Sequence, residues 1–596
     1  MILQALCDYY DRKQDDLPPF GFEEKAIPFI VVIDEVGQFI QLEDNREIED
    51  GRIIVRPVRV PKASGRSGAK SYETAYCLWD HYGYIAEQPK LAKPTDTPKE
   101  KEIDDAKKQH ISFKKLVSEL QKNLPDDIGV KAVDLFLNSG SEVHKLKTHE
   151  SWQECLKIKG CNLTFRLSGI NHLVCQSKQV INWVEQQPLP ESNVQDGFCL
   201  ITGEKSKIVR LHDTVSGVNQ KPAPLAAINE PAYTSFGKDK GFNFPVSAES
   251  SFKYAASLNH LLRKTSQSKF RIGEASYVCW SDKNNALENA LVSMFTDAKD
   301  DPDSTAQAVK SLFSTIHNGA YVADDGRDNF FVLGLAPNSA RIVVRYWQAG
   351  TIAEFSEKIA QWFNDIDIVG RDHYGFPSLK SLFRATALQY KDDNISPNLP
   401  ADVIRSLLSG TSLPETFIQA TLRRIKAEKS SDKIKFLRTG EIIFLRASII
   451  KACLNRKYRF STTHQKEVTV SLNKEENRIG YCLGRLFAVL EELQRDAHKD
   501  KNGKITINAT IRDRYYSSAS CTPKSVFGTL MRLSTHHLKK LENPGWRVNA
   551  EKRIGDVMGY ISEFPSHLDL ENQGLFAIGY YHQKQDFYTK NTDKGE

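Results

Sequence analysis

The sequence lacks the cysteine patterns that indicate a zinc site or a disulfide framework. Its ten cysteines are scattered over 596 residues, and no two of them form a Cys-x-x-Cys pair. A reducing compartment fits this usage. No run approaches the roughly 20 apolar residues needed to cross a bilayer, and the start, MILQALCDYYDRKQ, has too short an apolar stretch for a signal peptide. We therefore expect a cytoplasmic protein that does not enter a membrane.

A strong net charge is also absent. The formal charge is only +6 at pH 7, so the whole chain is not a polycation, and any contact with nucleic acid must come from local basic patches. A chain of 596 residues is expected to form several domains or one large elongated assembly.

The motifs of phosphate binding and catalysis are missing too. The segments SGRSGAKS (64–71) and ITGEKSK (201–207) resemble a phosphate-binding loop but lack the GxxxxGK[ST] spacing. His212 and His582 have no visible nucleophile or ligand partner, and lone histidines of this kind are mostly structural. We expect no enzyme and no cofactor.

Two acidic turns are the nearest approach to a metal site. The first, DDPDS, holds Asp300, Asp301 and Asp303, and the second is DDGRDN at 324–329. The second has no glutamate at the calcium-loop position, and Asp-rich turns are commonly plain turns. The sequence therefore predicts no metal site.

A basic and aromatic stretch, residues 51–87, is the most informative part of the sequence. Its first half has no carboxylate, its middle predicts a loop, and its end gathers five aromatic residues around Asp80 and His81. A mobile basic loop beside aromatic side chains suits the backbone and bases of a nucleic acid. The alternative is a sheet edge with a solvated basic face. The basic residues of this stretch are Arg52, Arg56, Arg59, Lys62, Arg66 and Lys70.

A second basic region lies at 421–460. Twelve Lys or Arg residues are opposed there by only Glu428, Asp432 and Glu441, and helices with this charge could follow phosphates over a long path. The alternative is again a solvated face. The twelve are Arg423, Arg424, Lys426, Lys429, Lys433, Lys435, Arg438, Arg446, Lys451, Arg456, Lys457 and Arg459.

Apolar periodicity predicts an α+β protein, with a mixed α/β N-terminal region followed by a C-terminal all-helical bundle. The β-branched runs at 27–33 and 53–60 predict strands. The apolar spacing from Ile352 to Ile366 and the apolar stripe from Leu483 to Ala497 are typical of helices. Four helices from about residue 480 would suffice for a bundle. The predicted parts are a β-rich segment (1–95), a mixed α/β segment (96–395), a basic helical connector (396–470) and the bundle (471–596).

Several segments together resemble one protein family along essentially the whole chain. They include CLWDHYGY (77–84), CLITGEKSKIVRLHDTVSGVN (199–219), AYTSFGKDKGFNFPVS (232–247), FVLGLAPNSARIVVRYW (331–347) and GRLFAVLEELQ (484–494). Their order and spread identify the chain as similar to the large subunit of the type I-C CRISPR Cascade effector complex.

The resemblance implies a function without catalysis. Such subunits join crRNA-containing Cascade subunits and a small subunit, recognise the protospacer-adjacent motif (PAM) on double-stranded target DNA and help to open the duplex. They then hold the displaced strand and receive a trans-acting helicase-nuclease. On this chain the implied DNA contacts are Lys62, Ser64, Gly65, Arg66, Ser67, Lys70, Asp80, His81, Tyr82, Arg423, Arg424, Arg456, Lys457 and Arg459.

One position departs from the family pattern, which often has Asn where this chain has His81. The motif that the chain reads is therefore left open. Two other functions remain as alternatives: a nuclease or nucleotide-dependent DNA-remodelling enzyme, and a scaffold that binds only protein subunits.

The resemblance also implies that the small subunit is made from the same gene by internal translation. None of the four methionines precedes the bundle cleanly, whereas Val468 and Val470 lie just before the helix that contains Leu483. We expect a second product that begins near Val468 or Val470 if the codon there is GTG.

Overall fold

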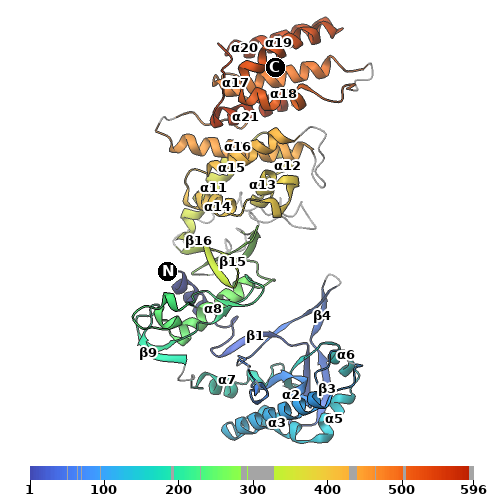
Figure 1. The fold of residues 1–596 in the computed structure, drawn as a ribbon, viewed down its shortest axis with the longest axis vertical. Coiled ribbons are helices and arrows are strands. Elements are labelled where there is room, and N and C mark those ends of the chain that lie inside the picture. Colours follow the sequence, from blue (N-terminus) through green and yellow to red (C-terminus); the bar gives the residue numbers. More distant parts are fainter. Residues whose placement is uncertain are drawn as a thin grey trace. The chain divides into compact units, whose positions relative to one another are not determined.

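A computed structural model describes residues 1–49, 52–63, 65–66, 68, 70–93, 95–188, 193–228, 230–283, 292, 318, 328–428, 439–462, 465–500 and 505–588. The chain divides into two compact units, coloured from blue to red along the sequence in Figure 1. The N-terminal unit is Met1–Val215 with Pro224–His260, and the C-terminal unit is Ser216–Ala223 with Leu261–Glu596. Within the described ranges, no helix has the length and apolar composition that crossing a membrane requires.

The N-terminal unit is built on a four-stranded sheet with the order β3-β2-β8-β7. The central strand β2 is buried along its whole length, because its sequence FIVVI is apolar at every position. It pairs in parallel with β8 and antiparallel with β3. Helices pack on the sheet through buried rings such as Phe113 and Phe165. These elements are β2 (Phe29–Ile33), β3 (Phe39–Asp44), β7 (Trp79–His81), β8 (Asn162–Leu167), α3 (Glu100–Asn123) and α4 (Ile128–Asn138).

The start of the basic stretch forms one strand in each of two short ribbons. The predicted strand at 53–60 is divided at Arg56, because its two halves pair with different partners. The first half forms a hairpin with β4 (Arg46–Glu49), and the second pairs with β1 (Phe22–Ala26). The two halves are β5 (Arg52–Val55) and β6 (Pro57–Pro61).

The rest of the N-terminal unit surrounds helix α8 (Ala248–Leu262). The Ser257 hydroxyl of α8 donates to the Leu6 carbonyl of α1 (Ile2–Arg12) at 2.8 Å. A hairpin of β9 (Val194–Phe198) and β10 (Lys205–Val209) completes this part.

The C-terminal unit begins with an antiparallel sheet of order β13-β14-β15-β16. Buried side chains of this sheet and of the helices that follow it form one continuous core. Thr351 caps the first of these helices, where its hydroxyl accepts a hydrogen bond from the Glu354 N–H. The elements are β13 (Lys269–Ile272), β14 (Ala275–Ser281), β15 (Asn329–Asn338), β16 (Arg341–Thr351), α11 (Ile352–Ile366), α13 (Leu379–Thr386), α14 (Leu399–Ser409), α15 (Glu415–Ala427) and α16 (Thr439–Phe460).

A helical bundle follows, and with it the predicted fold class is confirmed. Its core is formed by residues between Cys482 and Tyr580. All of these residues follow Val468, so the internal start near Val468 or Val470, which stays a prediction, would retain the whole core. The four predicted parts of the chain also stay predictions. The bundle helices are α17 (Ile479–Asp496), α18 (Ile511–Cys521), α19 (Pro523–Lys540), α20 (Pro544–Met558) and α21 (Leu570–Tyr588).

Helices α17 and α21 approach so closely that only glycine fits at their contact. A Cβ atom placed on Gly484 would lie 2.0 Å from the Phe576 carbonyl oxygen, and one on Gly579 would lie 2.2 Å from the Tyr481 carbonyl oxygen. Both neighbours are backbone atoms, so neither can turn aside. The opposite side of α21 packs into the core that the β13-β14-β15-β16 sheet forms with α11 and α16. Leu575, Ile578 and Tyr581 belong to that core.

Candidate nucleic-acid interface

Arg66 is the centre of the basic and aromatic stretch. Its guanidinium forms a two-point ion pair with Asp80, with 2.9 Å between Nη1 and Oδ1, and its Nε donates to the Thr74 carbonyl at 2.6 Å. The charged group lies 3.5 Å from the ring centroid of Tyr76 and 4.1 Å from that of Tyr84. Ion pairing and cation–π attraction therefore hold this point of the chain in place.

Asp80 is fully buried beneath this contact. Its carboxylate also accepts hydrogen bonds from the Tyr76 and His81 N–H groups, at 3.0 and 2.8 Å. Burial raises the pKa of Asp80, and the contacts with Arg66 oppose that rise. The Asp80 oxygens are enclosed by Arg66 and these two N–H groups, and a contact of Asp80 with DNA stays a prediction. Arg66 is paired with the Asp80 carboxylate of β7, and its contact with DNA stays a prediction.

His81 and Tyr82 begin helix α2 (Tyr82–Ala86). His81 Nδ1 accepts a hydrogen bond from the Gly83 N–H at 3.1 Å, and burial lowers the pKa of His81 to about 3. A neutral ring that accepts at Nδ1 carries its proton on Nε2, so His81 offers one donor at neutral pH. Tyr82 is buried, and its hydroxyl accepts from the Gly160 N–H at 2.9 Å. Tyr82 is thus held inside the fold, and DNA contacts at Tyr82 and His81 both stay predictions.

Lys62 and Lys70 are the accessible cations next to the Arg66 anchor. Lys70 has a side chain 78% exposed and lies 3.8 Å from Glu73. Lys62 is about half exposed and pairs with Asp213. Gly65 is exposed, with open space where a side chain would stand. Ser64 and Ser67 lie outside the described residues.

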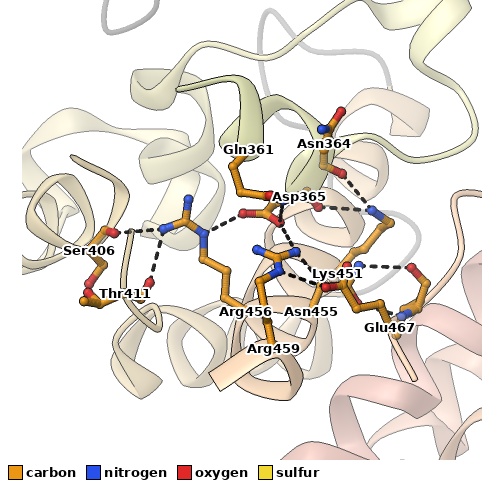
Figure 2. A network of polar contacts seen from close by, with 11 residues as sticks. Gln361, Asn364, Asp365, Ser406, Thr411, Lys451, Asn455, Arg456, Arg459 and Glu467 are labelled. Atoms are coloured by element: carbon orange, nitrogen blue, oxygen red, sulfur yellow. Dashed lines mark hydrogen bonds and ion pairs between the residues drawn. The ribbon is translucent and has the colours of Figure 1, made fainter. Parts of the chain in front are cut away.

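The second basic region contains a buried ion network around Asp365 of α11 (Figure 2). Arg456 Nε donates to Asp365 Oδ2 at 2.5 Å, and Arg459 Nη2 donates to Oδ1 at 2.9 Å. The side chains of Arg456 and Asp365 are each only 1% exposed. Arg456 also donates to the carbonyls of Ser406 and Thr411. Arg456 therefore ties α16 to α11 and α14, and its contact with DNA stays a prediction.

The neighbouring cations of α16 are also engaged. Arg459 reaches Glu467 at 2.8 Å in addition to Asp365, and Lys451 Nζ donates to the Asn364 and Asp365 carbonyls. Figure 2 shows these groups converging from α16 on the end of α11. Half-exposed Lys457 pairs with Glu571 at 2.7 Å.

On α15, Arg423 is exposed, while Arg424 lies 3.5 Å from Glu428. Arg423 and Lys426 line a cavity of about 460 Å³ between α15 and the start of α21. DNA contacts at Arg423, Arg424, Lys457 and Arg459 stay predictions. Lys429, Lys433, Lys435 and Arg438 lie outside the described residues.

No metal-binding cluster was found in the described part of the chain, where no three His, Cys, Asp or Glu side chains are grouped to hold an ion. The acidic turn with Asp300, Asp301 and Asp303 lies outside that part. Sequence reasoning missed Asp365 as the centre of the Arg456 network, because the two residues are far apart in the chain and no local pattern indicates that they meet.

A family model described as a CRISPR-associated protein (Cas_Csd1) matches residues 6–588. The match extends over nearly the whole chain and includes both compact units. The search of curated proteins gave no match.

Proposed function

Because the chain belongs to the Cas_Csd1 family of CRISPR-associated proteins, which confirms its resemblance to the large subunit of the type I-C Cascade, we propose that it recognises the PAM on duplex DNA. In such complexes guide pairing reads the long target sequence, and protein reads the short motif. We further propose that it aids duplex opening, holds the displaced strand and receives the helicase-nuclease, beside crRNA-containing subunits and a small subunit.

The anchored loop is the observation that supports this proposal best. Arg66 is held by Asp80 and two rings, so Lys62 and Lys70 flank a point that is fixed to the sheet. Such an arrangement suits two phosphates at a set spacing. The Nε2 donor of His81, at the N-cap position of α2, has the hydrogen-bonding character to meet an acceptor in a groove.

Replacing Lys62 and Lys70 together by alanine is expected to weaken duplex binding by the assembled complex. For each phosphate that the variant no longer neutralises, the slope of log K against log salt should become shallower by about 0.9. The measurement is a binding titration at several salt concentrations, with thermal unfolding as a check on the fold. Lys108→Ala with Lys157→Ala is the matched control, since both lysines are exposed and paired with nearby carboxylates. Wild-type affinity and slope in the Lys62/Lys70 variant would favour the scaffold alternative.

We also propose that the chain is not a nuclease or an ATPase. The phosphate-loop spacing fails at both candidate segments, and metal-assisted cleavage would need grouped carboxylates. The purified protein with magnesium or manganese is expected to leave DNA and ATP unchanged over hours. Cleavage that survives stringent purification and is lost in an Asp300/Asp301/Asp303 alanine variant would overturn this proposal.

A further inference from the structure

A turn in the N-terminal unit holds an aromatic ring in solvent. Phe236 is 97% exposed, more than any other large apolar side chain in the described ranges. It lies between two short helical turns, η4 (Pro231–Tyr233) and η5 (Lys240–Asn243). An exposed fraction this high leaves both faces of the ring open.

The backbone at this position is strained. Phe236 has φ of +52° and is followed by Gly237 at +70°, while Lys240 has φ of +45°. The left-handed region disfavours a bulky side chain, so a phenylalanine held there has an energetic cost. Burial of the ring does not offset that cost, because the ring is not buried.

Asn243 holds the strained turn in shape. Its Oδ1 accepts from the Ser235 N–H at 2.9 Å, and its Nδ2 donates to the carbonyls of Lys238 at 2.6 Å and Lys240 at 3.2 Å. The Lys238 N–H closes the turn on the Ser235 carbonyl at 3.0 Å. The hydrogen bonds of this one side chain therefore hold the tip of the turn in place.

Asp239 and Gly241 of the turn are bound to Arg210, next to the β9–β10 hairpin. Arg210, which follows β10, donates from Nε to Asp239 at 2.7 Å, and its carbonyl accepts from the Gly241 N–H at 2.9 Å. A Cβ on Gly241 would lie 2.7 Å from that carbonyl oxygen, so the close contact requires glycine. The ring is therefore presented on a rigid support rather than on a free loop.

The charge around the ring is positive. Lys238 is exposed and Lys240 is half-buried, and neither has an ion-pair partner among the residues that the structure describes. Asp239 between them is already paired with Arg210. A second ring, Tyr233, is 60% exposed at the other end of the turn.

We propose that Phe236 is a stacking platform for an unpaired nucleobase of DNA, with Lys238 and Lys240 contacting the adjoining phosphates. An open aromatic face next to unpaired cations is the combination that binds single strands without reading their sequence. The inference rests on the proposed function, which supplies the displaced strand as the source of the base.

The test uses the full chain and single-stranded DNA that carries 5-iododeoxyuridine, a base that cross-links on irradiation to an aromatic ring stacked on it. Wild-type protein is expected to cross-link at Phe236, as located by mass spectrometry. Phe236→Leu should lose that cross-link and weaken single-strand binding by about 5- to 100-fold, and Phe236→Tyr should retain both. Phe198→Leu is the matched control, because Phe198 on β9 is 68% exposed in the same unit.

The other outcomes are distinct. Single-strand binding by Phe236→Leu at the wild-type level overturns the inference, as does cross-linking only to an RNA of the same sequence. If Phe236→Leu instead fails to join the other Cascade subunits while binding DNA normally, the ring is a protein anchor and the inference is also wrong. Duplex binding, measured in parallel, tests the proposed function separately, because Phe236→Leu should leave it unchanged.

Discussion

Asp365→Ala is expected to destabilise the C-terminal unit by about 3–5 kcal/mol, the usual cost of leaving a buried charge without its partner. Arg456 is the charge left behind: its side chain is 1% exposed and its Nε donates to Asp365. Arg459 would keep Glu467. Urea unfolding of the full chain, with hydrogen exchange to locate the loss in α11 and α16, measures the effect.

Two further variants determine the cause of that loss. Asp402→Ala removes an exposed carboxylate that pairs with Arg405 at 3.3 Å, and an exposed pair is worth about 0–1 kcal/mol. Asp365→Ala with Arg456→Met should recover a large part of the stability, because no charge then stays buried. A single Asp365→Ala variant as stable as Asp402→Ala would contradict the assigned role of the network.

Gly484→Ala is expected to cost about 3 kcal/mol, at the upper end of the range for overpacking, although it adds a single methyl group to a helix. The new Cβ would stand 2.0 Å from the Phe576 carbonyl oxygen, so α17 and α21 must separate along a large part of their contact. Alanine is otherwise the better helix former, and on an open helix face the same change stabilises by up to about 1 kcal/mol. The measurement is chemical unfolding with hydrogen exchange in α21.

Gly528 on α19 and Gly555 on α20 provide matched controls. A Cβ atom on either glycine would meet no described residue within 4 Å beyond its own helix backbone and chain neighbours, so Gly528→Ala and Gly555→Ala should be neutral or slightly stabilising. If Gly484→Ala behaves as they do, the close approach of α17 and α21 is not required for the bundle.

Local pattern was enough to predict much of the fold. The apolar spacing from Ile352 to Ile366 corresponds to α11, which buries one face. The stripe from Leu483 lies on α17, although this helix is buried on all sides between Gly480 and Glu491. The β-branched run at 53–60 forms parts of two strands, β5 and β6, and the apolar periodicity of the sequence does not show this division. The choice of partner strand decided that division at Arg56, and partner choice depends on residues elsewhere in the chain.

The candidate site was less predictable for the same reason. The sequence shows the cations near Arg456 and Arg459 but does not show that Asp365 and Glu467 fold against them, so an internal network resembled a surface patch. At the N-terminal site the nearness of Arg66 and Asp80 in sequence was a usable signal. The Phe236 tip had a signal as well, a phenylalanine before glycine in a lysine-containing turn.

Helix α21 contributes side chains to two hydrophobic cores, so the C-terminal unit cannot complete its folding until α21 has been synthesised. Leu575 and Ile578 complete the core around α16, whereas Phe576 and Tyr580 complete the bundle. Ribosomes add about 5–20 residues per second and release N-terminal parts first, and α21 is the last helix that the structure describes. The core around α16 therefore lacks its α21 side chains for several seconds after α16 has been made, and its apolar face stays exposed during that time.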